Sequence, residues 1–185
     1  MHRLRQEYRN QPVAIIGGGA ADETERANAY GVAKILAENG VAIICGGGGG
    51  VMEAACMGAA EAGGVSIAVL PGLDPKAASP HATIVLPTDL GNLAIAAAAG
   101  RPDFSRNRVI TSAAVCAVAI GGKSGTANEI KLTLQFGKPV FAICDAPDPE
   151  QPNDLTDKVK KRLFQRPSSA KAAAEAVLAF LRIDK

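Results

Sequence analysis

The chain has 185 residues, a formal net charge of +2 and a hydrophobic content of 48%, with 20 glycines and few aromatic residues. A chain of this length can bury a substantial core without disulfides or metals, so one domain spanning residues 1–185 is expected. The balanced charge argues against nucleic-acid binding, and the absence of a signal-like or membrane-length apolar run predicts a cytoplasmic protein with no membrane partner.

Short apolar runs alternate with helical patterns along the chain, an order that indicates βαβ units. Most of these runs lack alternating polar residues, so helices are expected to cover both sheet faces. The prediction is a three-layer, Rossmann-like α/β fold with a mostly parallel sheet of six or seven strands. The predicted strands are Val13 to Gly17, Val41 to Cys45, Val65 to Leu70, Thr83 to Leu86, Val115 to Ile120 and Pro139 to Cys144.

Capping and breaking residues mark the expected helices. Asp22, with Glu25 three residues later, has the pattern of a capping box and starts the first helix, which Asn39-Gly40 ends. The segment Val159 to Gln165 fits either an edge strand or a helix, and the acidic, proline-containing segment before it fits a loop. The other predicted helices are Val51 to Ala62, Phe104 to Ala113, Ser124 to Gly137, and a last one that is capped by Ser168 or Ser169 and ends near Ile183.

The cysteines show no paired spacing of the kind that binds metals. Three of the four end or lie within apolar runs, which is typical of buried thiols. We therefore predict no metal site from Cys45, Cys56, Cys116 and Cys144.

Three glycine-rich turns follow predicted strands and carry the strongest functional signal. Ligands of parallel sheets bind at the C-terminal strand ends, where glycine lets an anion approach the N–H groups of the next helix. Glycines also make tight turns without a ligand, but three such turns at one sheet edge favour a binding site. The turns are Gly17-Gly18-Gly19, Gly46-Gly47-Gly48-Gly49-Gly50 and Gly121-Gly122-Lys123-Ser124-Gly125-Thr126.

Two familiar nucleotide-binding motifs do not fit these turns. Gly17-x-Gly19 lacks the third glycine of the dinucleotide fingerprint, because position 22 is Asp. Gly122-Lys123-Ser124 lacks the first glycine of the P-loop, because position 117 is Ala. Neither a standard NAD site nor a P-loop is therefore predicted.

Arg106 and Glu129 are the candidates for chemistry at this edge. Arg106 lies in the first turn of the helix before the fifth strand and Glu129 lies one turn into the helix after it, so both are expected above the same strand ends. Arg106 and Arg108 lie near a helix N-terminus, which disfavours cations, and a bound anion would offset that effect. Two solvated arginines and a capping role for Glu129 remain open alternatives.

The stretch G-G-K-S-G-T-A-N-E from Gly121 to Glu129 resembles the P-G-G-x-G-T-x-x-E motif of the lysine-decarboxylase-like superfamily. This superfamily includes the Lonely Guy (LOG) phosphoribohydrolases and the molybdenum cofactor carrier proteins. The likeness covers nearly the whole chain: the family's arginine falls on Arg106, and C-G-G-G-G-G-V-M from Cys45 to Met52 corresponds to its phosphate loop. For an enzyme, the resemblance implies that Arg106 and Glu129 help to cleave an N-glycosidic bond while Thr126 and the glycines hold phosphate.

Several positions depart from the enzymes' pattern. Gly121 replaces Pro, Lys123 replaces Gly, and the Gly46 to Gly50 turn is one residue shorter. Lys123 adds a point charge that a glycine does not supply. The segment Asn92 to Pro102 is inserted relative to the family and is expected to shape either the pocket or an oligomer contact.

Other positions are closer to the cofactor-carrier branch, which binds a phosphorylated pterin or nucleotide without turning it over. These are Gly50-Val51-Met52, Leu70-Pro71-Gly72 and Arg106-Asn107. Val51, Met52 and Asn107 therefore join the predicted binding residues.

The preferred hypothesis is a binding protein for a phosphorylated, nucleotide-like small molecule, in the manner of a molybdenum cofactor carrier. It requires no cofactor of its own, and its ligand is molybdenum cofactor or a nucleoside monophosphate. The alternative is a LOG-type enzyme, with Arg106 and Glu129 as catalytic residues, that releases free base and ribose 5-phosphate. A single-stranded nucleic-acid module is disfavoured, because the chain has two Tyr, five Phe and no Trp. The resemblance also implies a homodimer or homotetramer.

Overall fold

The computed structural model describes residues 10–100, 105–149 and 163–182, and their strands form one parallel sheet. The strands are β1 (Val13–Gly17), β2 (Ile43–Cys45), β3 (Ser66–Leu70), β4 (Ile84–Pro87), β5 (Ala117–Ile120), β6 (Val140–Ile143) and β7 (Phe164–Gln165). Their order is β4-β3-β2-β1-β5-β6-β7, and every neighbouring pair is parallel. The predicted α/β class is confirmed, and all seven strands described are parallel.

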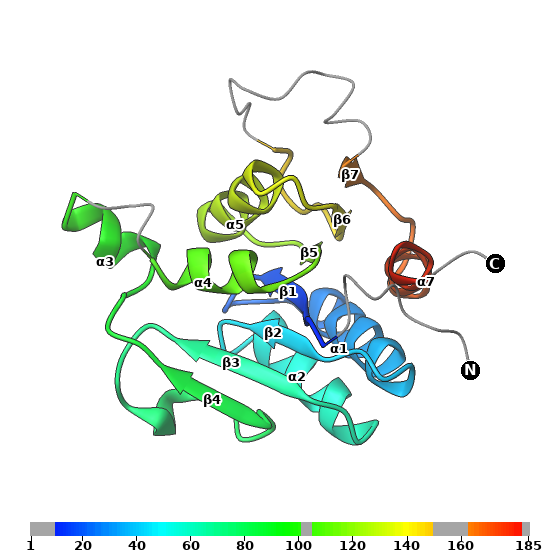
Figure 1. The fold of residues 1–185 in the computed structure, drawn as a ribbon, viewed down its shortest axis with the longest axis horizontal. Coiled ribbons are helices and arrows are strands. Elements are labelled where there is room, and N and C mark those ends of the chain that lie inside the picture. The colour runs from blue at the N-terminus through cyan, green and yellow to red at the C-terminus, as the bar shows by residue number, and fades with distance from the viewer. Residues whose placement is uncertain (1–9, 101–104, 150–162, 183–185) are drawn as a thin grey trace.

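Helices cover the two faces of the sheet and complete three layers (Figure 1). On one face, α1, α2 and α7 bury their apolar sides against the sheet, and on the other α4 and α5 do so. Burial of these aliphatic faces is the main favourable contribution to folding. The helices are α1 (Glu23–Glu38), α2 (Val51–Glu61), α3 (Leu93–Ala98), α4 (Arg106–Ala113), α5 (Ser124–Gln135) and α7 (Ala170–Leu181).

Two predicted helix starts, those of α1 and α7, are confirmed by capping hydrogen bonds, while the predicted start at Phe104 lies outside the described residues. Asp22 Oδ1 accepts the Glu25 N–H at 2.8 Å, and Glu25 Oε2 accepts the Asp22 N–H at 3.0 Å, so the capping box is complete. Ser169 caps α7 by accepting the Ala172 N–H at 3.2 Å. The edge-strand reading of Val159 to Gln165 holds for its last residues, because β7 pairs with β6, while residues 159–162 lie outside the described part of the chain.

One helix was not predicted. The Ala-rich segment after β4 forms α3, which is capped by Asn92 because its Oδ1 accepts the Ile95 N–H at 3.0 Å. An Asn followed by a short run of alanines, the best helix formers, explains this helix in retrospect. Residues 101 and 102 of the inserted segment lie outside the described residues.

The cysteine side chains lie largely where the sequence predicted them. Cys45, Cys56 and Cys116 are buried as predicted, and Cys144 is partly exposed.

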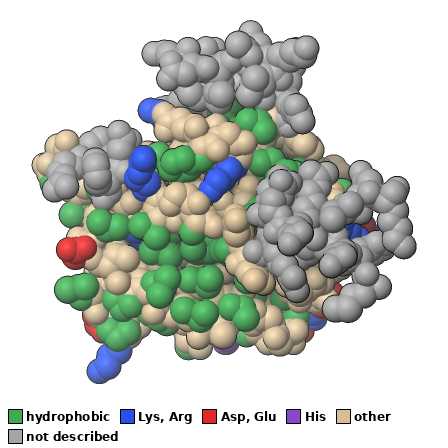
Figure 2. Space-filling view, viewed as in Figure 1, with side chains coloured by type: hydrophobic (Ala, Val, Ile, Leu, Met, Phe, Trp, Pro, Cys, Tyr) green, Lys and Arg blue, Asp and Glu red, His purple; other side chains and the backbone are tan. Residues whose placement is uncertain are grey.

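The expectation that helices cover both faces of the sheet does not hold at β4, where Ile84 and Leu86 are 43% and 42% exposed. Hydrophobic side chains gather on the surface around β4, the edge strand, which has no helix in front of it (Figures 1 and 2). None of the described helices is both long and apolar enough to cross a lipid bilayer.

Close packing of α1 against α2 gives a prediction about two glycines. A Cβ at Gly58 on α2 would overlap the backbone carbonyl of Tyr30 on α1, whereas a Cβ at Gly31 would make an ordinary 3.6 Å contact with Ala170. Gly58→Ala should therefore destabilise the protein by about 1–3 kcal/mol. Gly31→Ala should stabilise it by up to about 1 kcal/mol through helix propensity. Chemical denaturation of both variants checks this, and equal effects would contradict the packing argument.

Candidate functional site

The site lies where the sheet order reverses. Strands β2, β3 and β4 extend to one side of β1 and β5, β6 and β7 to the other, so the loops that leave β1 and β5 diverge. The three glycine turns meet there. The Val51 N–H donates to Gly18 O at 3.1 Å, and a Cβ at Gly50 would lie 2.5 Å from Gly19 O. A Cβ at Gly122 would lie 3.2 Å from Gly18 N, so the third turn touches the first.

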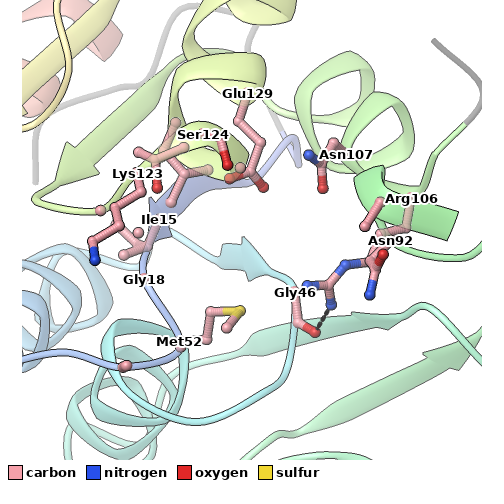
Figure 3. A pocket seen from close by; sticks show the side chains of 18 of the residues that line it. Ile15, Gly18, Gly46, Met52, Asn92, Arg106, Asn107, Lys123, Ser124 and Glu129 are labelled. Carbon is pink, nitrogen blue, oxygen red and sulfur yellow. Dashed lines mark hydrogen bonds between the residues drawn. The ribbon is translucent and has the colours of Figure 1, made fainter. Parts of the chain in front are cut away.

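These turns surround a cavity of about 740 Å³ that also includes Arg106 and Glu129 (Figure 3). The structure therefore brings the two candidate residues and all three turns to one pocket. The predicted residues that line it are Gly17, Gly18, Gly19, Gly46, Met52, Arg106, Asn107, Gly122, Lys123, Ser124, Gly125, Thr126 and Glu129. Those that lie in the same turns without lining the cavity are Gly47, Gly48, Gly49, Gly50, Val51 and Gly121.

Other lining residues were not identified from the sequence as part of the site. Buried strand residues Ile15 and Ile16 form its floor, and Ala94 and Ala97 of α3 add a small apolar wall. Of the two roles open for the inserted segment, the structure thus shows that it shapes the pocket. The remaining lining residues are Ala20, Asp22, Glu25 and Asn92.

The first turn of α5 presents unpaired backbone donors to the cavity. Ser124, Gly125 and Thr126 all line the pocket, and their N–H groups have no acceptor among the described residues. Lys123, at the N-cap, is exposed and makes no ion pair with a described residue. Free N–H groups, the positive end of a helix dipole and a lysine together favour an anion.

An acidic side chain supports the turn before α5. Glu25 Oε1 accepts the Gly122 N–H at 3.3 Å, and a Cβ at Gly121 would overlap the same carboxyl group. Gly121 and Gly122 have φ values of +51° and +88°, a conformation that favours glycine. The sequence signal for this contact was the capping box, which assigns Glu25 to its own helix but does not show its second partner.

Arg106 holds the backbone of the pocket wall. Its Nη1 donates to the carbonyl of Gly46 and, at 3.1 Å, to that of Val69, at the ends of β2 and β3 (Figure 3). Its Nη2 makes no hydrogen bond within the described residues. Burial lowers the pKa of the guanidinium, while the neighbouring Glu129 acts in the opposite direction. The solvated-arginine alternative is therefore wrong for Arg106.

Glu129 is a buried acid with no side-chain partner among the described residues. Its side chain points into the cavity (Figure 3), it is 8% exposed, and its carboxyl makes no hydrogen bond with a described residue. Burial raises its pKa to about 8, against a smaller opposing effect of Arg106. Glu129 is therefore mostly protonated at pH 7 when the pocket holds no ligand, and it caps neither its own helix nor another described one.

The fold and the pocket define a class of protein: a Rossmann-like α/β protein whose glycine turns form a site suited to an anion at the switch point of the sheet. The particular family follows from comparison with known proteins. The chain belongs to the SLOG cluster4 family, whose model matches residues 10–174. This agrees with the lysine-decarboxylase-like, cofactor-carrier-like resemblance found in the sequence.

Known proteins with similar sequences or structures extend this assignment. An uncharacterized protein of Archaeoglobus fulgidus is 34% identical over 131 residues, which are 71% of this chain and 78% of the other. The molybdenum cofactor binding protein of Rippkaea orientalis has a TM-score of 0.75 and 26% identity, covering 93% of this chain and 98% of that one. The molybdenum cofactor carrier protein of Chlamydomonas reinhardtii has a TM-score of 0.74 and 28% identity, covering 93% and 99%.

The bonds of Arg106 predict that it matters for stability even without ligand. Arg106→Ala leaves the buried carbonyls of Gly46 and Val69 unpaired and should lower the free energy of unfolding by about 2 kcal/mol or more. Arg108→Ala, on the exposed side of the same helix, should change it by less than about 0.5 kcal/mol. Urea denaturation of both variants measures this, and two equally stable variants would show that Arg106 has no structural role.

The raised pKa of Glu129 predicts how stability depends on pH. The folded pKa of about 8 lies above the ordinary value of 4.5, so the unfolded chain loses this proton first. The contribution of Glu129 to the free energy of unfolding is therefore complete below pH 4.5. It is lost as pH rises towards 8, by at most about 1.4 kcal/mol per pH unit. Comparing the unfolding free energies of the wild type and Glu129→Gln between pH 5 and 8 isolates this group. If the unfolding free energies of the two proteins changed with pH in the same way, Glu129 would be ionised in the folded protein.

Proposed function

We propose that this protein binds a phosphorylated, nucleotide-like or pterin-like small molecule in the pocket and works as a carrier in the manner of the molybdenum cofactor carrier proteins. The observation that carries the proposal is the first turn of α5. There, Lys123 and three backbone N–H groups that have no acceptor in the described part of the chain line one end of a cavity large enough for such a ligand.

The rest of the pocket suits the non-phosphate part of this ligand. Ile15, Ile16 and Met52 form apolar surfaces, and the small side chains of Ala94 and Ala97 leave room for a flat ring. A phosphate at one end and an apolar slot with a few polar groups at the other is the usual composition of a nucleotide site. The pocket thus supports both kinds of ligand that the sequence suggested, a phosphorylated pterin and a nucleoside monophosphate.

The relatives support the carrier interpretation over the enzyme. Two solved structures that cover nearly the whole chain are described as a molybdenum cofactor binding protein and a molybdenum cofactor carrier protein. In addition, Nη1 of Arg106 bonds to two backbone carbonyls, and the carboxyl of Glu129 has no partner that would orient it for catalysis. A LOG-type hydrolysis therefore has no specific support from this arrangement.

We further propose that the protein acts in the cytoplasm as a homodimer or homotetramer. Native mass spectrometry of gently purified protein should show the copy number together with a bound phosphorylated compound. A ligand-free protein that also fails to bind nucleoside monophosphates or phosphorylated pterins would contradict the proposed function.

The phosphate end of the pocket gives a prediction for Lys123. Lys123→Ala should weaken GMP binding about 3- to 10-fold through the loss of one charge-assisted contact. Guanosine, which lacks the phosphate, should bind the variant and the wild type equally. Lys131→Ala, on the same helix and outside the pocket lining, serves as the matched control. Titration calorimetry measures the affinities, and an equal loss for GMP and guanosine would contradict a phosphate at this end.

A further inference from the structure

The buried acid Glu129 is not needed to bind a phosphate, and its place in the pocket requires another explanation. It lies one turn beyond Thr126 on α5, past the N–H groups that would hold the anion. A buried carboxyl in the wall of an anion site, in addition to those of Asp22 and Glu25, would repel the ligand if it were ionised without a partner. Burying it unpaired also lowers stability at neutral pH. A ligand that supplies hydrogen-bond donors at this position would remove both penalties.

The amide of Asn107 adds an acceptor beside Glu129. Asn107, which is 5% exposed and lines the cavity, donates its Nδ2 to Asn128 Oδ1 at 3.0 Å, so this amide is fixed with its own Oδ1 unpaired. Figure 3 shows the Glu129 and Asn107 side chains on the same side of the cavity, both directed into it. Two carboxyl oxygens and one amide oxygen therefore face the space where the ring of the ligand would lie.

The charged groups around Glu129 allow its carboxyl to ionise when a bound ligand donates hydrogen bonds to it. Arg106 on α4 is the charged group that acts on it, and Nη2 of Arg106 has no partner among the described residues. Lys123 is on the same helix as Glu129, while Asp22 and Glu25 line the pocket from α1. The guanidinium can thus offset the charge of a carboxylate, and its free Nη2 can donate to a carbonyl on the ligand.

We infer that Glu129 selects a ligand with a 2-amino-4-oxopyrimidine ring, as found in guanine and in pterins, by accepting its ring N–H and its exocyclic amino group. This inference rests on the proposed function. The two parallel donors of such a ring match the two oxygens of a carboxylate, as in bidentate recognition of other planar donor pairs. Its carbonyl offers an acceptor for Arg106. Adenine has no carbonyl and pairs an acceptor nitrogen with its amino group, so it matches a protonated acid or an amide instead.

The test compares GMP with AMP, which carry the same phosphate and ribose. Because both phosphates titrate alike, the ratio of the two affinities isolates the ring. In the wild type, GMP should bind at least about 10-fold more tightly than AMP at pH 8. This preference should rise by at least about 10-fold from pH 6 to pH 8 as the ionised fraction of Glu129 grows. A phosphorylated pterin should follow GMP.

Glu129→Gln supplies the matched variant, since glutamine keeps the shape but offers one donor and one acceptor. It should bind GMP and AMP within about 3-fold of each other, with no change of their ratio between pH 6 and 8. Its AMP binding also reports that it is folded. Lys123→Ala should weaken both nucleotides and leave the ratio as in the wild type.

The possible results distinguish a failure of the ring-selection inference from a failure of the proposed function. If the wild type binds GMP and AMP equally, if its preference falls as pH rises, or if Glu129→Gln keeps the preference, the ring-selection inference is wrong while the phosphate site stands. If the wild type binds neither nucleotide nor the phosphorylated pterin at any pH in this range, the proposed function fails, and this inference fails with it.

Discussion

The structure of the site depends on the close approach of three backbone turns at the point where the sheet order reverses. Gly17 ends β1 and leaves no room for a side chain, because a Cβ there would lie 2.6 Å from Ile120 O on β5. Gly50 and Gly122 contact the same first turn from the other two sides. Only glycines permit this approach, and it is what brings the N-termini of α2 and α5 to one cavity.

Arg106 connects the three glycine turns to the half of the sheet that contains β2 and β3. Its side chain donates hydrogen bonds to the carbonyls at the ends of β2 and β3. Its backbone N–H donates to Gly91 O in the loop before α3. One residue thus links the glycine turn after β2, the end of β3 and the loop before the inserted helix that narrows the pocket. A lysine could not reproduce this, because its single ammonium lacks the planar set of donors with which arginine holds two carbonyls while Nε and Nη2 keep no partner among the described residues.

Apart from α3, which was not predicted, and β7, for which a helix was the open alternative, the elements and the position of the pocket could be predicted from the sequence, because they follow from local patterns. Glycines after apolar runs predicted the turns, and the capping box at Asp22 and Glu25 predicted the start of α1 within one residue. What it did not show are the partners of long side chains. The bond from Glu25 to Gly122 joins residues 97 positions apart, and that from Arg106 to Gly46 joins residues 60 apart. The position of α3 over the pocket likewise depends on tertiary packing, on which a short alanine run carries no information.

The two ends of the pocket make opposite demands on a ligand. Among the described residues, the start of α5 offers unpaired N–H groups and the Lys123 ammonium as donors, whereas one turn further on the unpaired Oδ1 of Asn107 and the carboxylate of Glu129, once ionised, are acceptors. A simple anion satisfies only the first end, and a neutral ring satisfies only the second. A molecule with a phosphate on one side and paired N–H groups on the other satisfies both. Burying Glu129 without a partner lowers the stability of the empty protein, and such a cost is expected where a pocket is organised for a ligand and not for the fold.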